Sequence, residues 1–123
     1  MEKNEILVPE LNNETIGSMI YIIRGQKIML DFELAKIYGY ATRDFNNQIK
    51  HNLDRFDNDF RFQLSLKEWN DILRWKKSTT KNISKIRTIP YAFTEQGIYM
   101  LMTVLKGDLA TKQSIALIDA FYF

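Results

Sequence analysis

Short apolar stretches along the chain predict the strands of a small sheet. Residues 19–23 and 27–30 are apolar and rich in β-favouring side chains, and a glycine-containing turn separates them, which is typical of a β-hairpin. Residues 60–64 alternate between apolar and polar side chains and predict a half-buried strand. Residues 88–93 contain Pro90, which cannot donate a ladder hydrogen bond. We therefore expect at most an edge strand or an extended segment there. If residues 88–93 pair with residues 60–64, the basic stretch between them forms an arm or wing off a small sheet.

Two helices around a glycine predict a helix-turn-helix-like pair. Residues 32–38 carry an apolar face and end at Gly39, a residue type that commonly terminates helices. Residues 43–53 form the second helix and present a long polar face. The apolar residues of this helix recur every fourth position and are expected to be buried: Phe45, Ile49 and Leu53. The second helix of such a pair can enter the major groove of DNA, although many small helical domains share the same spacing.

Three more helices complete the predicted fold, over residues 66–76, 95–106 and 109–123. Polar side chains stand where N-caps are preferred, at Asp31, Thr42, Ser65, Thr94 and Asp108. Ser65 and Glu68 also match a capping box. The sequence therefore predicts an α+β fold, in which a small β-hairpin or sheet accompanies the helix-turn-helix-like pair and two packed C-terminal helices.

The first 18 residues differ in composition from the rest of the chain. They hold one Lys against four Glu and show no sustained apolar periodicity. We expect a flexible leader over residues 1–18 and one domain over residues 19–123. No apolar run approaches the ~20 residues that span a bilayer, and the N-terminus lacks a signal-peptide pattern. With no Cys in the chain, a cytoplasmic protein without a membrane segment is expected.

Positive charge gathers in one stretch, residues 74–87, which contains no acidic residue. Its basic residues are Arg74, Lys76, Lys77, Lys81, Lys85 and Arg87. Such a run favours phosphate binding, because Lys and Arg displace condensed counterions, but it is also typical of a solvated loop. Within this stretch we expect the ring of Trp75 to pack over the following loop rather than to stand exposed.

The sequence offers little support for catalysis. There is one His and no Cys. A Ser-His-Asp system would therefore need His51 as its base, and this residue lies on the polar face of a predicted helix. The glycine-rich loops that bind phosphates in nucleotide enzymes are missing. Asp54, Asp57 and Asp59 form a dense acidic group that is more typical of a solvated turn than of a metal site. We therefore expect no catalytic residues, no metal site, no cofactor and no enzyme activity.

Three stretches together resemble a known family. Residues 24–40 read RGQKIMLDFELAKIYGY, residues 55–64 read RFDNDFRFQL, and residues 90–101 read PYAFTEQGIYML. Their order and spacing are similar to the "ORF-six-N" type of KilA-N-related domain, which occurs in phage and mobile-element proteins. The resemblance implies a DNA-binding module of a transcriptional regulator or antirepressor. It also suggests that Gly97 allows close packing at a helix start.

The resemblance and the polar helix face together predict double-stranded DNA as the partner. Asn can bond adenine bidentately, and Arg or Lys can bond guanine. The expected base contacts are Arg43, Asn46, Asn47 and Lys50. The expected phosphate contacts are Arg24, Lys27, Arg74, Lys76, Lys77, Lys81, Lys85 and Arg87.

A protein-interaction module is the alternative prediction. An antirepressor can act by binding a repressor protein, and a fold does not dictate its function. The apolar last helix would then form the contact, or the seam of a homodimer, through Ile118, Phe121 and Phe123.

Overall fold

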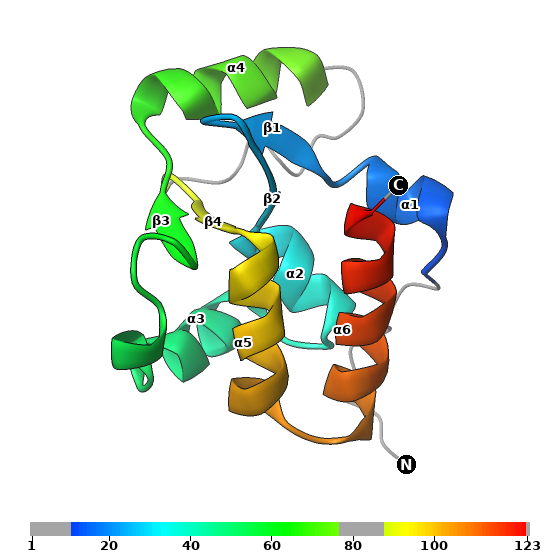
Figure 1. Ribbon diagram of the computed structural model, residues 1–123. Coiled ribbons are helices and arrows are strands. Elements are labelled where there is room, and N and C mark those ends of the chain that lie inside the picture. Colours follow the sequence, from blue (N-terminus) through cyan, green and yellow to red (C-terminus); the bar gives the residue numbers. More distant parts are fainter. Residues whose placement is uncertain (1–10, 77–87, 123) are drawn as a thin grey trace.

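The computed structural model shows a four-stranded antiparallel sheet with helices on both faces (Figure 1). It describes residues 11–76 and 88–122. In chain order the elements are α1 (Asn13–Gly17), β1 (Tyr21–Ile23), β2 (Gln26–Leu30), α2 (Asp31–Ile37), α3 (Thr42–Lys50), the short 3-10 helix η1 (Leu53–Arg55), β3 (Arg61–Gln63), α4 (Leu66–Lys76), β4 (Tyr91–Phe93), α5 (Glu95–Leu105) and α6 (Asp108–Phe121). The predicted α+β class is confirmed.

The strands lie in the order β1-β2-β4-β3. The predicted hairpin is confirmed, and its tight turn uses positive φ angles at Arg24 (56°) and Gly25 (77°). The pairing of β3 with β4 is also confirmed. The prediction of an edge strand is wrong, because β4 lies between β2 and β3. Pro90 precedes the strand and takes part only through its carbonyl, which accepts the Leu64 N–H at 3.1 Å.

The sheet separates two apolar clusters. On one face, α4 covers the sheet with Trp69 and Ile72, which pack with Phe62. On the other face, α2, α3, α5 and α6 enclose a larger cluster that includes Phe45 and Phe93. Consecutive strand residues point to opposite faces. The strands β2 and β4 therefore contribute to both clusters, with Met29 and Phe93 on one face and Ile28, Leu30 and Ala92 on the other, whereas β1 and β3 contribute apolar side chains to the smaller cluster. The helix-turn-helix-like pair and α4 therefore lie on opposite sides of the sheet (Figure 1).

Two of the five predicted N-caps are confirmed. Thr94 Oγ1 accepts the Gly97 N–H at 3.2 Å, and Ser65 and Glu68 form the expected capping box, with bonds of 2.8 and 3.1 Å. The other three predictions are wrong by one position, because the helices begin at Asp31, Thr42 and Asp108 themselves. Their N-cap residues are Leu30, Ala41 and Gly107, none of which supplies a side-chain cap.

Part of the expected leader is helical and packed. Asn12 and Thr15 form a capping box for α1, with bonds of 2.9 and 3.0 Å. Ile16 is 1% exposed and belongs to the larger apolar cluster. Because Ile16 is the one large apolar residue of the five-residue helix α1, the sequence shows no apolar periodicity there from which burial could be predicted. Residues 1–10 lie outside the described residues.

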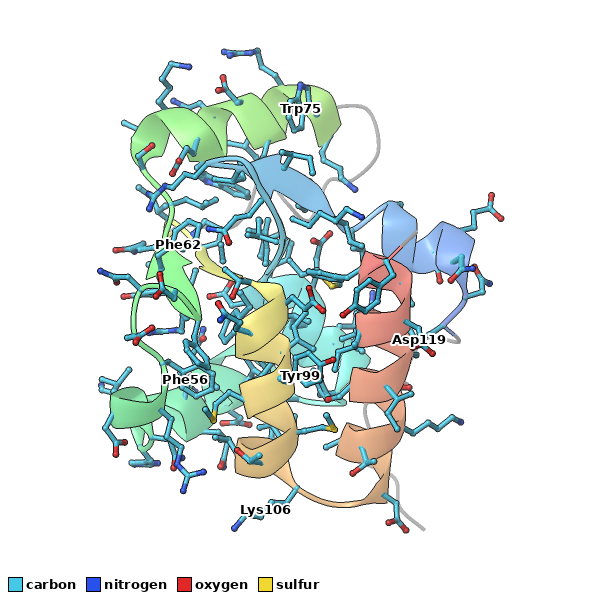
Figure 2. The ribbon with its side chains drawn as sticks, viewed as in Figure 1. Phe56, Phe62, Trp75, Tyr99, Lys106 and Asp119 are labelled. Carbon is cyan, nitrogen blue, oxygen red and sulfur yellow. The ribbon has the colours of Figure 1, made fainter. Side chains whose placement is uncertain are left out.

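The side chains of Leu53 and Trp75 are more exposed than predicted. Leu53 is 50% exposed because α3 ends at Lys50 and the chain turns into η1, which rotates Leu53 away from the apolar stripe. Trp75 is 63% exposed near the end of α4 (Figure 2). Its ring lies off the face that carries Trp69 and Ile72, so the sheet does not cover it. Within the described residues, no helix has the length and apolarity needed to cross a bilayer.

Candidate nucleic-acid interface

The α2–α3 pair is held together by an aromatic anchor. Phe45 of α3 is fully buried. Its ring lies 6.3 Å from those of Tyr38 and Tyr40, centroid to centroid, and 5.7 Å from that of Phe93 in β4. Gly39 has φ of 80°, which favours glycine and lets the chain leave α2 sharply toward α3. The anchor fixes α3 against the sheet and leaves its opposite face in solvent.

Helix α6 supports the turn of this pair through two buried polar residues. Gln113 Nε2 donates to the Ile37 carbonyl at 3.0 Å, and the Ser114 and Tyr38 hydroxyls are 2.6 Å apart. The last carbonyls of a helix lack partners inside the helix, so the Gln113 bond satisfies one that would otherwise be orphaned. Sequence reasoning missed both residues. The only signal was two polar residues interrupting the apolar side of α6.

Three of the four predicted base contacts share the exposed face of α3. Arg43, Asn47 and Lys50 are exposed, and at 100° per residue they point away from the buried Phe45 and Ile49. No ion pair within the described residues engages Arg43 or Lys50. The arrangement presents one guanidinium, one amide and one ammonium group along two turns of helix.

Asn46, the fourth predicted base contact, is half-buried and faces Asp31. Asn46 Nδ2 donates to Asp31 Oδ2 at 3.2 Å. Asp31 is 6% exposed, and its carboxylate also accepts the backbone N–H groups of Phe32 and Tyr91. Burial raises the pKa of Asp31, although these hydrogen bonds and the charge of Arg61 act in the opposite direction.

Arg61 completes this buried polar group. Its guanidinium carbon lies 3.7 Å from the centre of the Tyr91 ring, an arrangement that favours a cation electrostatically. Burial lowers the pKa of Arg61, whereas Asp31 and Tyr91 raise it. Asp31, Asn46, Arg61 and Tyr91 therefore connect α2, α3, β3 and β4 at one point.

A cleft of about 400 Å³ opens beside this group, between the first turn of α3 and the segment that leads into β4. Its lining residues are Asp31, Phe32, Thr42, Arg43, Asn46, Thr88, Ile89 and Tyr91. Thr88 directly follows the basic residues 77–87 in the sequence. The cleft thus joins the exposed face of α3 to the residue at which the basic stretch ends.

The four described residues predicted to contact phosphate make contacts within the protein. Arg24 pairs with Glu68 at 2.9 and 3.1 Å, and its guanidinium carbon lies 4.1 Å from the centre of the Phe62 ring. This pairing raises the pKa of Arg24 and lowers that of Glu68. The remaining bonds are Arg74 to Asp71, Lys27 Nζ to the Phe121 carbonyl at 2.7 Å, and Lys76 Nζ to the Ser18 carbonyl at 2.6 Å.

These four residues are not brought to the exposed face of α3. Arg24 lies in the hairpin turn, Arg74 and Lys76 belong to α4, and Lys27 of β2 bonds the carbonyl of Phe121 at the end of α6. The hairpin and α4 lie across the sheet from α3 (Figure 1). Lys77, Lys81, Lys85 and Arg87 lie outside the described residues. The role of all eight in phosphate binding stays a prediction.

Comparison with protein families identifies the family of the chain. The model of the ORF6N domain matches residues 18–104, which include all three motifs described above. The chain belongs to the ORF6N domain family. Neither a curated protein nor a solved structure matches the sequence significantly. The matched range of this ORF6N domain ends within α5, so α6 supports the α2–α3 turn from outside it.

A second acid of the ORF6N domain, Glu33, is half-buried in the first turn of α2. Tyr21 Oη donates to Glu33 Oε2 at 3.3 Å, whereas Glu33 Oε1 has no hydrogen-bond partner among the described residues. Burial raises the pKa of Glu33 to about 7, the Asp31 charge adds to this, and Lys76 and the Tyr21 bond oppose it. Burial and the Glu33 charge raise the pKa of Tyr21 as well.

The raised pKa of Glu33 predicts a pH-dependent stability. Folding favours the protonated carboxyl, so stability falls as the pH rises from about 4.5 to about 7 and stays reduced above that range. We expect Glu33→Gln to increase the free energy of unfolding by about 2–3 kcal/mol at pH 8 and to change it little at pH 4. Urea unfolding at both pH values measures the difference, with Glu14→Gln at an exposed site as the control. A Glu33→Gln protein that is less stable than wild type at pH 8 would contradict the prediction.

Proposed function

We propose that this ORF6N domain binds double-stranded DNA through α3, as part of a KilA-N-related, phage- or mobile-element-derived transcriptional regulator or antirepressor. The observation that carries the proposal is the exposed stripe of Arg43, Asn47 and Lys50 on the second helix of the α2–α3 pair. A helix of this size fits the major groove, where each base pair presents a distinct set of donors and acceptors.

Each residue of the stripe has a chemical role in this proposal. Arg43 and Lys50 donate to guanine O6 and N7, and Asn47 pairs with adenine N6 and N7. Within α3 these two cations stand against one acid, Asp44. The net charge of the helix is therefore small, so most of the affinity for phosphate has to come from other residues.

The basic stretch and the residues around α4 are the proposed source of that affinity. The side chains of Arg24 and Arg74 are 47% and 72% exposed in their ion pairs. Exposed pairs of this kind contribute only about 0–1 kcal/mol, so a DNA phosphate can replace the carboxylate partner. Because both residues lie across the sheet from α3, that phosphate would belong to DNA beyond the segment read by α3. Thr88 lines the cleft beside α3 and directly follows the basic stretch in the sequence, which supports a role of that stretch in the same interface.

Removing two cations from α3 tests the proposal. Fluorescence anisotropy with a duplex selected by the wild-type protein should show an affinity loss of about 100-fold for Arg43→Ala/Lys50→Ala, because each base contact contributes about 1–3 kcal/mol. The wild-type slope of log K against log salt should be steeply negative, at about 0.9 per phosphate contact. Charge reversal at Lys76, Lys77 and Lys81 should reduce that slope.

Lys112→Ala is the matched control, because Lys112 is an exposed residue of α6. It should bind DNA as the wild type does. Equal affinities of the α3 double variant and the Lys112→Ala control for the selected duplex would contradict the proposal that α3 binds the major groove. Full affinity after the charge reversal would remove the proposed role of the basic stretch.

The alternative function is binding to a repressor protein or to a second copy of the chain through the last helix. The predicted contact is wrong for Ile118 and Phe121, which are 7% and 5% exposed and pack in the larger cluster. Phe123 lies outside the described residues. The apolar residues that α6 does expose are Leu109 and Ile115, followed by Tyr122. A partner that binds this helix would contact these, and Ile115→Glu would abolish its binding without affecting DNA binding.

A further inference from the structure

Asn46 and Asn47 are adjacent residues of the same type in different surroundings. Asn47 is exposed, and its amide makes no hydrogen bond within the described residues. Asn46 is half-buried and bonds Asp31 at 3.2 Å. The two residues therefore offer different chemistry to a ligand in front of α3.

The charge of Asp31 fixes the direction of the Asn46 amide. A carboxylate only accepts hydrogen bonds, so the NH₂ group of Asn46 has to face it. Asn46 Oδ1 then points into the protein, where it is buried and has no partner among the described residues. Reading adenine bidentately needs a free amide oxygen and nitrogen on the same side. Asn46 does not present this pair, whereas Asn47 does.

The bond between Asn46 and Asp31 lies on one flank of α3. Phe45 and Ile49 anchor the buried side of the helix, but apolar contacts are not directional. On the other flank, the side chains of Asp44 and Gln48 are exposed. The Asn46 bond is therefore a directional contact that, in addition to the aromatic anchor, resists rotation of α3 about its own axis.

Small rotations of α3 matter for base reading. Side-chain tips lie about 5–6 Å from the helix axis, so a rotation of about 20° moves them by about 2 Å. A hydrogen bond tolerates only a few tenths of an ångström. Asp31 is itself held by the backbone of β4 and α2, through the N–H groups of Tyr91 and Phe32. Through Asp31 and Asn46, the sheet thereby sets the direction in which the exposed residues of α3, Arg43, Asn47 and Lys50, point.

We propose that Asn46 is a positioning residue and not a base-reading residue: with Asp31 it fixes the rotation of α3, so that Asn47 reads the base. This assignment rests on the proposed function and revises the sequence-based expectation for Asn46. It predicts that truncation of Asn46 and truncation of Asn47 change DNA binding in different ways.

The test compares Asn46→Ala with Asn47→Ala on the duplex selected by the wild-type protein, on all its single-base variants, and on random duplex. Asn47→Ala should lose about tenfold discrimination at one base-pair position. Asn46→Ala should keep the wild-type base preference at every position while its affinity for the selected duplex falls about five- to tenfold. Its affinity for random duplex should change by less than about twofold, since phosphate contacts do not depend on the rotation of α3.

Asp31 variants separate positioning from simple loss of stability. Asp31→Asn keeps an oxygen acceptor for Asn46 Nδ2 and should retain selective binding. Asp31→Ala should lose as much selectivity as Asn46→Ala, and the double variant should lose no more than either one. The unfolding midpoint of each variant is measured first, and binding is then measured at a temperature where all of them are folded.

Either of two results with Asn46→Ala alone overturns the assignment and leaves the proposed function intact: a changed base preference at one position, or wild-type selectivity. Wild-type protein that binds no duplex at low salt overturns the proposed function, and this assignment with it. Additive losses in the double variant show that Asp31 and Asn46 act separately, which also overturns the assignment.

Discussion

Gly97→Ala is expected to lower the free energy of unfolding by about 3 kcal/mol or more. An exposed Gly-to-Ala change inside a helix normally stabilises by about 1 kcal/mol, so the expected sign is reversed. A Cβ at Gly97 would lie 2.1 Å from the Phe60 carbonyl oxygen and 3.1 Å from its carbon. The obstacle is backbone, which cannot rotate aside as a flexible side chain would.

The Phe60 carbonyl is held in place from the same helix. It accepts the Thr94 N–H at 3.1 Å and the Thr94 hydroxyl at 3.3 Å, and that hydroxyl also donates to the Asp59 carbonyl at 2.7 Å. Moving Phe60 to make room would break these bonds at the start of α5. The close packing expected of Gly97 from the sequence is thus confirmed, and its partner is the turn before β3.

Gly17→Ala is the matched control for this prediction. Gly17 ends α1, and a Cβ there meets nothing within 4 Å. We expect a change of less than about 0.5 kcal/mol at this site. Urea unfolding followed by circular dichroism measures both variants. Equal stabilities for Gly97→Ala and Gly17→Ala would show that α5 shifts freely away from Phe60, contrary to the packing described.

Phe45→Ala is expected to cost about 3–5 kcal/mol of stability. Phe45 is fully buried and contacts three other aromatic rings, those of Tyr38, Tyr40 and Phe93. Truncation removes a large apolar side chain and leaves a cavity that the rigid sheet and α2 cannot fill. It also frees α3 from its main anchor, so DNA selectivity should fall together with stability.

Leu53→Ala is the contrasting variant, because both residues belong to the same apolar repeat in the sequence. Leu53 is 50% exposed in η1, and we expect its truncation to cost less than about 1 kcal/mol. Thermal unfolding of the two proteins compares them directly. Similar losses for Phe45→Ala and Leu53→Ala would mean that α3 continues through Leu53 in solution.

The sequence predicted only part of the candidate site. The helix pair, its glycine turn and the exposed face with Arg43, Asn47 and Lys50 follow from local periodicity. The sequence could not separate Asn46 from Asn47, because the difference depends on Asp31, 15 residues away. The supports from Gln113 and Ser114 reach over 76 residues, and their only local signal was that two polar residues interrupt the apolar side of α6.

The order and spacing of three stretches in the sequence were enough to indicate the ORF6N family. Local chemistry alone determined the hairpin with its Arg24-Gly25 turn, the capping box at Ser65 and the Thr94 cap. These features depend on residues within a few positions of one another, so their energies are already set in a short segment. Only the tertiary structure decided that β4 is a central strand, that Ile16 is buried, that Leu53 and Trp75 are exposed, and that Asp31 bonds Asn46. Those outcomes depend on which surfaces meet across the sheet, because burial and the pairing of buried polar groups arise only when distant segments pack together.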